Sequence, residues 1–159
     1  MASNNLREFN AGLDQFYKVE VIGEASAMVR RVAFAVDRAL VMGTPVGNPD
    51  LWKANNFPKK ISRGKKGYTG KGYVGGRARA NWIPTLGTPF NGTVERKDRQ
   101  GSATIALLAP ITANFRLGTT VWISNNIPYM ERLNNGHSTQ APVGFVEMAI
   151  EAGIREAMK

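Results

Sequence analysis

A stretch of 30 residues that suits neither a helix nor a strand divides this chain, and it limits the fold more than any other feature. Residues 47–76 contain seven glycines and the steps Asn48-Pro49 and Phe57-Pro58, and their apolar residues follow neither a period of two nor one of 3.6. We therefore predict an extended loop over 47–76 in a single domain, 1–159, whose regular elements lie on either side of it.

The excess positive charge lies in and just after this loop. Residues 51–94 hold nine Lys or Arg and no acidic residue, whereas the rest of the chain has twelve basic and twelve acidic residues. Such a basic loop suggests an anionic partner, either duplex phosphate or an acidic protein surface. A solvated loop whose charge keeps the protein soluble is the alternative. The residues expected to face a partner are Trp52, Lys53, Lys59, Lys60, Arg63, Lys65, Lys66 and Lys71.

Amphipathic helices are predicted on both sides of the loop. Apolar residues recur at three- and four-residue steps from Ala25 to Leu40, which predicts a helix over 24–43. In the N-terminal segment 1–23, similar spacing from Leu6 to Tyr17 indicates a second helix or an extension of the first. A C-terminal helix is expected over 141–158, with Pro142 at its first position.

The region between these helices, 77–124, is expected to form the sheet. Weak alternation over 76–86 and β-branched and aromatic residues over 119–124 predict two strands, with Trp82 and Trp122 in the core. Residues 102–116 suit either a helix or a strand, because Pro110 would kink a helix. The fold class is α+β: a long N-terminal helix and a C-terminal helix on a small, mainly antiparallel sheet, with a long basic Gly-rich loop.

Nothing in the sequence points to catalysis, a metal or a cofactor. The chain has no cysteine and a single histidine, so thiolate and multi-histidine metal sites are excluded. His137 has Ser138 beside it and Glu131 nearby, but neighbours in a loop rarely form a triad, and we interpret it as a surface residue. The P-loop spacing fails around Gly70 and Lys71, and no apolar run is long enough to span a membrane.

Three motifs in a fixed order carry a resemblance to a known family. The first is Thr-Pro-Val after the predicted helix, the second a Gly-Arg-x-Arg-x-x-Trp stretch, and the third an Asn-Asn-Ile-Pro-Tyr step. Together they resemble the putative tail-component family of tailed bacteriophages, also described as tail-completion or neck proteins. The residues that match are Thr44, Pro45, Val46, Gly76, Arg77, Arg79, Trp82, Asn125, Asn126, Pro128 and Tyr129.

The resemblance implies a non-enzymatic virion protein at the head–tail neck or along the tail tube. Such a subunit would assemble in the host cytoplasm as a ring, for which tail symmetry suggests six copies. Its partners would be neighbouring neck, tail-terminator or tail-tube proteins, with genomic DNA in the channel as a second contact. The basic insertion after Val46 departs from the family pattern. A nucleic-acid-binding protein acting outside a virion remains the alternative, and an enzyme is the third.

Overall fold

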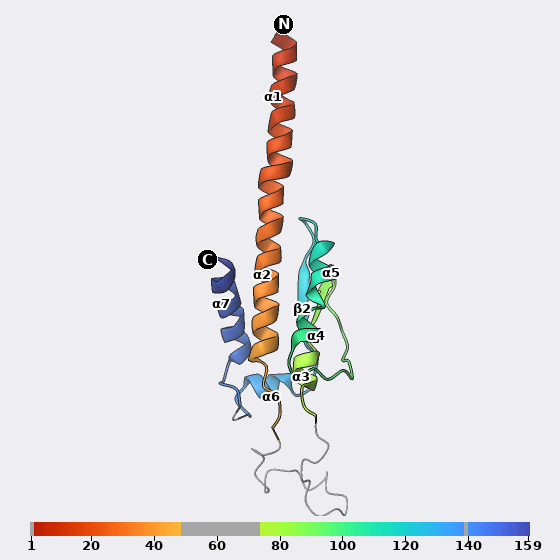
Figure 1. Cartoon of the computed structure of the whole chain (residues 1–159), viewed down its shortest axis with the longest axis vertical. Helices are drawn as coiled ribbons and strands as arrows, with labels where there is room; N and C mark the ends of the chain where they lie inside the picture. The colour runs from red at the N-terminus through yellow and green to blue at the C-terminus, as the bar shows by residue number, and fades with distance from the viewer. Residues whose placement is uncertain (1, 49–73, 139) are drawn as a thin grey trace, which may run out of the picture.

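The computed structural model describes residues 2–48, 74–138 and 140–159, and its longest element is one continuous helix at the N-terminus. This helix comprises α1 (Ala2–Phe16), a π-helical turn η1 (Tyr17–Val21) and α2 (Ile22–Gly43). At 1.5 Å per residue it is about 63 Å long. The rest of the molecule surrounds α2, whereas α1 projects beyond it (Figure 1).

A two-stranded antiparallel sheet lies on one side of α2. β1 (Ile83–Leu86) pairs with β2 (Val121–Ser124), with Ile83 opposite Ser124 and Leu86 opposite Val121. Helical segments flank the sheet: α3 (Arg77–Ala80), α4 (Ser102–Ile105), α5 (Leu108–Ala113) and α6 (Met130–Asn134). Residues 102–116 are thus mainly helical. The α+β fold class is confirmed, with a long N-terminal helix, a C-terminal helix and a small antiparallel sheet, although the C-terminal helix packs mainly on the N-terminal helix and not on the sheet.

The C-terminal helix α7 (Phe145–Ala157) lies antiparallel to α2 on the other side of it (Figure 1). A glycine permits their close approach: a Cβ built on Gly153 would lie 2.6 Å from the Cα of Val36. Nearer the end of α2, a Cβ built on Gly43 would lie 3.7 Å from the Cβ of Ala149. Small residues at the crossing therefore bring the two helix backbones together.

The hydrophobic core lies where α2, α3, α6 and α7 meet. Its members are less than a tenth exposed, and half-buried apolar side chains surround them. Burial of such side chains contributes about 1.5–3 kcal/mol each. The buried residues of this cluster are Leu40, Val41, Trp82, Met130, Phe145 and Ala149.

The strand predicted over 76–86 is wrong in its first half. Residues 77–80 form the helical turn α3, closed by hydrogen bonds from Ala80 N to Gly76 O and from Asn81 N to Ala78 O. Gly75 and Gly76 have φ of 72° and 81°, a left-handed backbone that a strand does not use. The strand therefore begins only at Ile83.

Two further predictions need correction. Trp122 lies on β2 but is 40% exposed, and its indole N–H donates to the carbonyl of Gly87 at 2.9 Å, so Trp122 is not a core residue. Pro142 is not the first residue of the C-terminal helix, because left-handed Gly144 (φ 73°) precedes α7, which begins at Phe145.

The parts of the chain that the structure describes contain no helix with the length and hydropathy required to cross a lipid bilayer. Most of the predicted loop, residues 49–73, lies outside the described residues, and so does Thr139.

Candidate assembly surface

The three family-like motifs, far apart in the sequence, meet at the lower end of α2. Fully buried Thr44 follows the helix, and its Oγ1 donates to the carbonyl of Leu40 at 2.7 Å. The same oxygen accepts a hydrogen bond from the indole N–H of Trp82, also at 2.7 Å. This pair joins the first motif to the second and satisfies two buried polar groups.

Arg79, in the second motif, caps the C-terminus of α2. Its guanidinium donates to the carbonyls of Thr44 at 2.9 Å and Met42 at 3.1 Å, and to that of Arg99 at 2.7 Å. Helix C-termini leave such carbonyls unpaired and carry partial negative charge, so a cation is favourable here. Burial lowers the pKa of Arg79, and the charge of Asp98 opposes that shift.

Gly76 has no substitute in this arrangement. A Cβ at this position would lie 2.7 Å from the backbone of Asp98 and Arg99, and its φ of 81° disfavours any side chain. From the third motif, the amide of Asn125 donates to the carbonyl of Ala78 at 2.9 Å. The motifs therefore hold one another through backbone contacts.

Arg77 differs from Arg79 because it faces solvent. It pairs with Glu95 at 2.6 Å, where both side chains are substantially exposed, and such surface pairs contribute only about 0–1 kcal/mol. Arg77 also lines a small pocket of about 140 Å³ with Pro45, Gly47 and Tyr129. Residues on both sides of the 49–73 segment line this pocket, so the two flanks of that segment lie close together.

Asp98, four residues before α4, supports the cluster. Its carboxylate accepts the backbone N–H of Gly101 at 2.7 Å and both the N–H and hydroxyl of Thr104 at 2.8 Å. Burial raises the pKa of Asp98, but these hydrogen bonds, helped by the charge of Arg96, outweigh it and lower the pKa below its ordinary value. The sequence did not indicate this role for Asp98.

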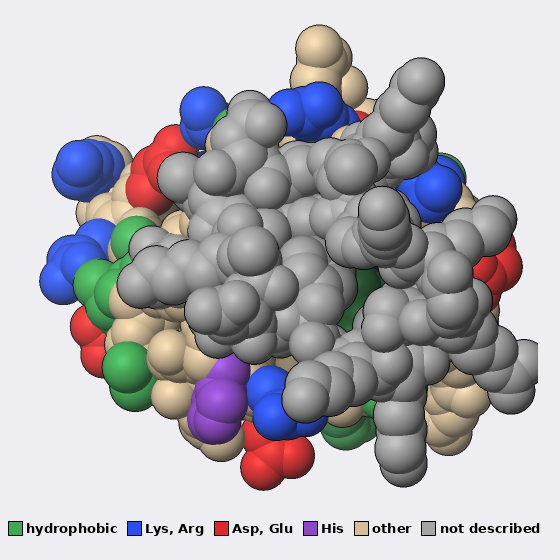
Figure 2. Space-filling model, turned by 90° about the horizontal axis from the view of Figure 1, so that it is seen from below, with side chains coloured by type: hydrophobic (Ala, Val, Ile, Leu, Met, Phe, Trp, Pro, Cys, Tyr) green, Lys and Arg blue, Asp and Glu red, His purple; other side chains and the backbone are tan. Residues whose placement is uncertain are grey.

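Most of the motif residues thus use their polar groups on the protein's own backbone, and we interpret the cluster as structural. The predicted partner-facing residues, from Trp52 and Lys53 to Lys71, lie outside the described residues. Figure 2 shows the end of the molecule near their flanks, where the visible basic side chains alternate with acidic ones around the rim. His137 is exposed and its Nδ1 lies 3.1 Å from the carbonyl of Arg132.

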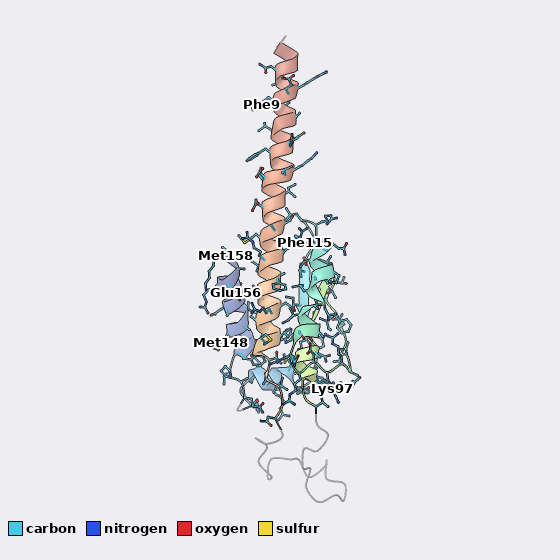
Figure 3. All side chains as sticks on the ribbon, in the orientation of Figure 1. Phe9, Lys97, Phe115, Met148, Glu156 and Met158 are labelled. Atoms are coloured by element: carbon cyan, nitrogen blue, oxygen red, sulfur yellow. The ribbon has the colours of Figure 1, made fainter. Side chains whose placement is uncertain are left out.

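A stripe of exposed apolar side chains on α1 and the start of η1 is the most unusual surface that the structure describes. The side chains are 51–64% exposed, which is rare for a connected set of large apolar residues in a monomer. Their three- and four-residue spacing places them on one face of the helix. Phe9 points into open space well beyond the rest of the molecule (Figure 3). We call this set the α1 stripe; it consists of Leu6, Phe9, Leu13, Phe16 and Tyr17.

The π-helical turn connects the α1 stripe to the face of α2 below it. A π turn holds one residue more than an α turn, so the side-chain pattern resumes one residue later. In an uninterrupted α-helix the next residue on the face of the stripe would be Glu20. Because of the extra residue in η1, Val21 lies on that face instead. The residues that follow it there, at steps of four, three and four, are Ala25, Met28 and Val32. The apolar face therefore continues along the whole helix.

At the level of the sheet this face opens into an apolar groove of about 440 Å³ between α2 and the start of β2. We call it the α2–β2 groove. One wall comes from α2 and the other from residues at and before β2, of which Thr119 and Thr120 are exposed. The lining residues are Met28, Val29, Val32, Ala33, Val36, Thr119, Thr120, Val121 and Ile123, none of which carries a charge.

One buried carboxyl group lies apart from these surfaces. Asp37 on α2 is fully buried, and neither carboxylate oxygen has a hydrogen-bond partner among the described residues. Burial raises the pKa of Asp37 from 3.8 to about 7. Within the described ranges, no three His, Cys, Asp or Glu side chains lie close enough together to hold a metal ion.

The helical spacing of the α1 stripe was predicted from the sequence, but its lack of a cover among the described residues was not. The signal was present, since the stripe contains aromatic residues in a segment with its own apolar period. The burial of Asp37 also had a signal in the sequence, because Asp37 lies four residues before Val41, on a helix face that packs into the domain. In comparisons with protein-family models, curated proteins and solved structures, the chain gives no significant match, so the family resemblance rests on the three motifs.

Proposed function

We propose that this chain is a non-enzymatic structural subunit of a tailed-phage virion. In this proposal it completes the tail or joins it to the head at the neck, and it assembles as a ring through subunit interfaces. The observation that carries the assembly part is the α1 stripe, a set of bulky apolar side chains on a helix that projects from the domain.

The energetics favour an additional partner for α1. Isolated helices of about 15 residues are marginal in water, and most helix stability comes from packing of an apolar face. Residues 5–16 are all exposed, so α1 receives no such packing from the described part of its own chain. Covering Phe9 and Phe16 alone would contribute about 1.5–3 kcal/mol each. Association therefore supplies what the folded monomer lacks.

The location at the neck rests on the motifs. In the structure they form one cluster around Thr44, Trp82 and Arg79, at the end of the molecule opposite the projecting helix (Figure 1). The flanks of the basic segment leave the domain beside this cluster. A subunit with an apolar surface at one end and the flanks of a basic segment at the other suits a ring around a channel that holds nucleic acid.

The test is incorporation into particles. Quantitative mass spectrometry of purified virions from the virus that encodes this chain should find it in several copies per particle. A deletion of its gene should leave filled heads and tails that do not join, and the chain supplied in trans should restore joining. Absence from purified particles would contradict the proposal.

The charge distribution favours a second candidate, a nucleic-acid-binding protein that acts outside a virion. It rests on the nine basic residues of 51–94 without an acidic one. If this candidate is right, the purified chain stays monomeric and binds duplex DNA with an affinity that falls steeply with salt. Neutralising Lys59, Lys60, Lys65 and Lys66 should then reduce the slope of log K against log salt by about 3 to 4.

A further inference from the structure

We propose that the α1 stripe of one copy of this chain binds in the α2–β2 groove of another copy. The inference rests on the proposed function, because it specifies the interface through which the subunits would assemble. It starts from two apolar surfaces that the described part of the chain leaves uncovered: the stripe, more than half exposed, and the uncharged groove.

The two surfaces cannot meet within one chain. α1 is continuous with α2 through η1, so the stripe extends away from the groove along the same helix (Figure 1). A rigid helix cannot fold back on itself without breaking the turn that joins its halves. Contact between stripe and groove therefore requires two molecules.

The dimensions of the stripe suit a groove better than a second stripe. The seam of the stripe is formed by Leu6, Phe9, Leu13 and Phe16, so every second position carries an aromatic ring. Phe9 and Phe16 are also bulkier than the aliphatic residues that pack best at coiled-coil positions. The groove's volume of about 440 Å³ provides the space that such rings require.

The area is sufficient for association when several copies act together. Five bulky side chains that are 51–64% exposed would bury roughly 500 Å² from one partner. If the receiving copy buries a similar area in the groove and on the surface around it, one contact covers about 1,000 Å², at the lower limit for a specific interface. A copy that both inserts its helix and receives one makes two such contacts, and head-to-tail contacts of this kind close into rings when the rotation allows it.

Two sets of variants test the contact by its effect on mass. Phe9→Asp with Phe16→Asp places two charges on the stripe, and Ala11→Asp with Gln15→Asp places the same charges on the opposite, exposed face of α1. The first pair should abolish association of the full chain in analytical ultracentrifugation at 10 to 100 μM, and the second should leave the wild-type mass. Equal behaviour of the two pairs would overturn the proposal.

The groove has a corresponding pair. Thr120→Arg at the exposed lip should block insertion, whereas Thr93→Arg, on an exposed connection, should not. Val29→Asp tests the opposite wall, and circular dichroism with thermal melting establishes that each variant is folded. Mixing the stripe variant with a groove variant leaves one intact stripe and one intact groove, so a 1:1 heterodimer should form although neither variant associates alone. Persistent monomers in that mixture would refute the contact.

Disulfide cross-linking tests the contact even if no substitution blocks association completely. It can be made site-specific because the chain has no natural cysteine. Chains with Cys substituted at Phe9, Leu13 or Phe16 are mixed with a differently tagged chain carrying Thr120→Cys and oxidised mildly. At least one stripe position should give the mixed disulfide. Disulfides between two stripe positions only would show a helix–helix interface and overturn the proposal.

The outcomes also separate this inference from the proposed function. A wild-type dimer whose stripe and groove cross-link would support the contact and contradict the ring. Incorporation into particles that survives both the stripe and the groove variants would support the proposed function and refute the contact.

Discussion

Asp37 predicts an unusual dependence of stability on pH. Its carboxyl group is buried without a hydrogen-bond partner among the described residues, and burial raises its pKa from 3.8 to about 7. The folded protein therefore binds a proton there that the unfolded chain has already released. The contribution of Asp37 to the unfolding free energy should therefore be greatest below about pH 4. It should decrease as the pH rises from about 4 to 7 and be lost above that.

The magnitude follows from the size of the shift. One pKa unit corresponds to 1.36 kcal/mol, so the full shift from 3.8 to about 7 corresponds to about 4 kcal/mol. From pH 5 to pH 8 the pH passes through about two pKa units of this shift, so the unfolding free energy should fall by about 3 kcal/mol. Many domains have only 5–15 kcal/mol of stability, so this is a large fraction.

Asp37→Asn removes the titration while preserving the shape of the side chain. Urea unfolding of wild type and variant at pH 5, 6, 7 and 8 gives the difference in unfolding free energy at each pH, in which the other titrating groups cancel. The variant should gain about 3 kcal/mol relative to wild type from pH 5 to pH 8. Asp14→Asn, on exposed α1, serves as the control and should show no such trend. Parallel pH profiles for wild type and Asp37→Asn would show that the carboxyl group is solvated or paired in the folded protein.

Five further substitutions test the packing and the cap of α2. Gly153→Ala should lower the unfolding free energy by about 1–3 kcal/mol in thermal or urea unfolding, because the new Cβ would collide with the α2 backbone. The control Gly23→Ala, in open space within a helix, should raise it by about 0.5–1 kcal/mol. Equal effects of the two substitutions would refute the close crossing of α2 and α7. Arg79→Lys should lower the unfolding free energy by about 1–3 kcal/mol, because a lysine cannot donate to all three carbonyls that the guanidinium reaches. An unchanged unfolding midpoint would show that this cap contributes nothing to stability. Trp82→Ala should cost about 3–5 kcal/mol and half-exposed Trp122→Ala clearly less; the reverse order would contradict the assignment of the core.

The helices could be predicted from sequence because their apolar residues follow a local period. The spacing from Ala25 to Leu40 predicts α2, and the spacing from Leu6 to Tyr17 predicts the helical character of α1. What spacing cannot give is whether another element covers a helix face. The C-terminal part of the α2 face is covered by α7 and the core, and the face of α1 is covered by nothing in the described structure, although the two patterns look alike in the sequence.

The errors have local causes. The turn at α3 depends on Gly75 and Gly76 in left-handed conformations, and glycine is compatible with a loop, a turn or a bulge alike. The prediction for Trp122 assumed that an aromatic residue on a strand faces the core, but a two-stranded sheet leaves much of its area exposed. The contact between Thr44 and Trp82 joins residues 38 positions apart, which no local pattern encodes.

The candidate site was only partly predictable for the same reason. The partner contact predicted from the sequence, Trp52 and the basic residues from Lys53 to Lys71, lies outside the described residues and stays a prediction. The α1 stripe became a candidate only when the helix proved to project from the domain (Figure 1). The one-residue shift at η1, which aligns the stripe with the groove, was not predicted from the sequence.

Particle incorporation of matched variants tests the central claim most directly. Wild type, the stripe variant Phe9→Asp with Phe16→Asp, and the opposite-face control Ala11→Asp with Gln15→Asp would each be supplied in trans to a virus that lacks the gene, and purified virions would be quantified by mass spectrometry. We predict that wild type and the control enter particles in equal numbers and that the stripe variant, although folded, does not. Virions that contain none of the three proteins would contradict the claim that this chain is a structural subunit of the particle.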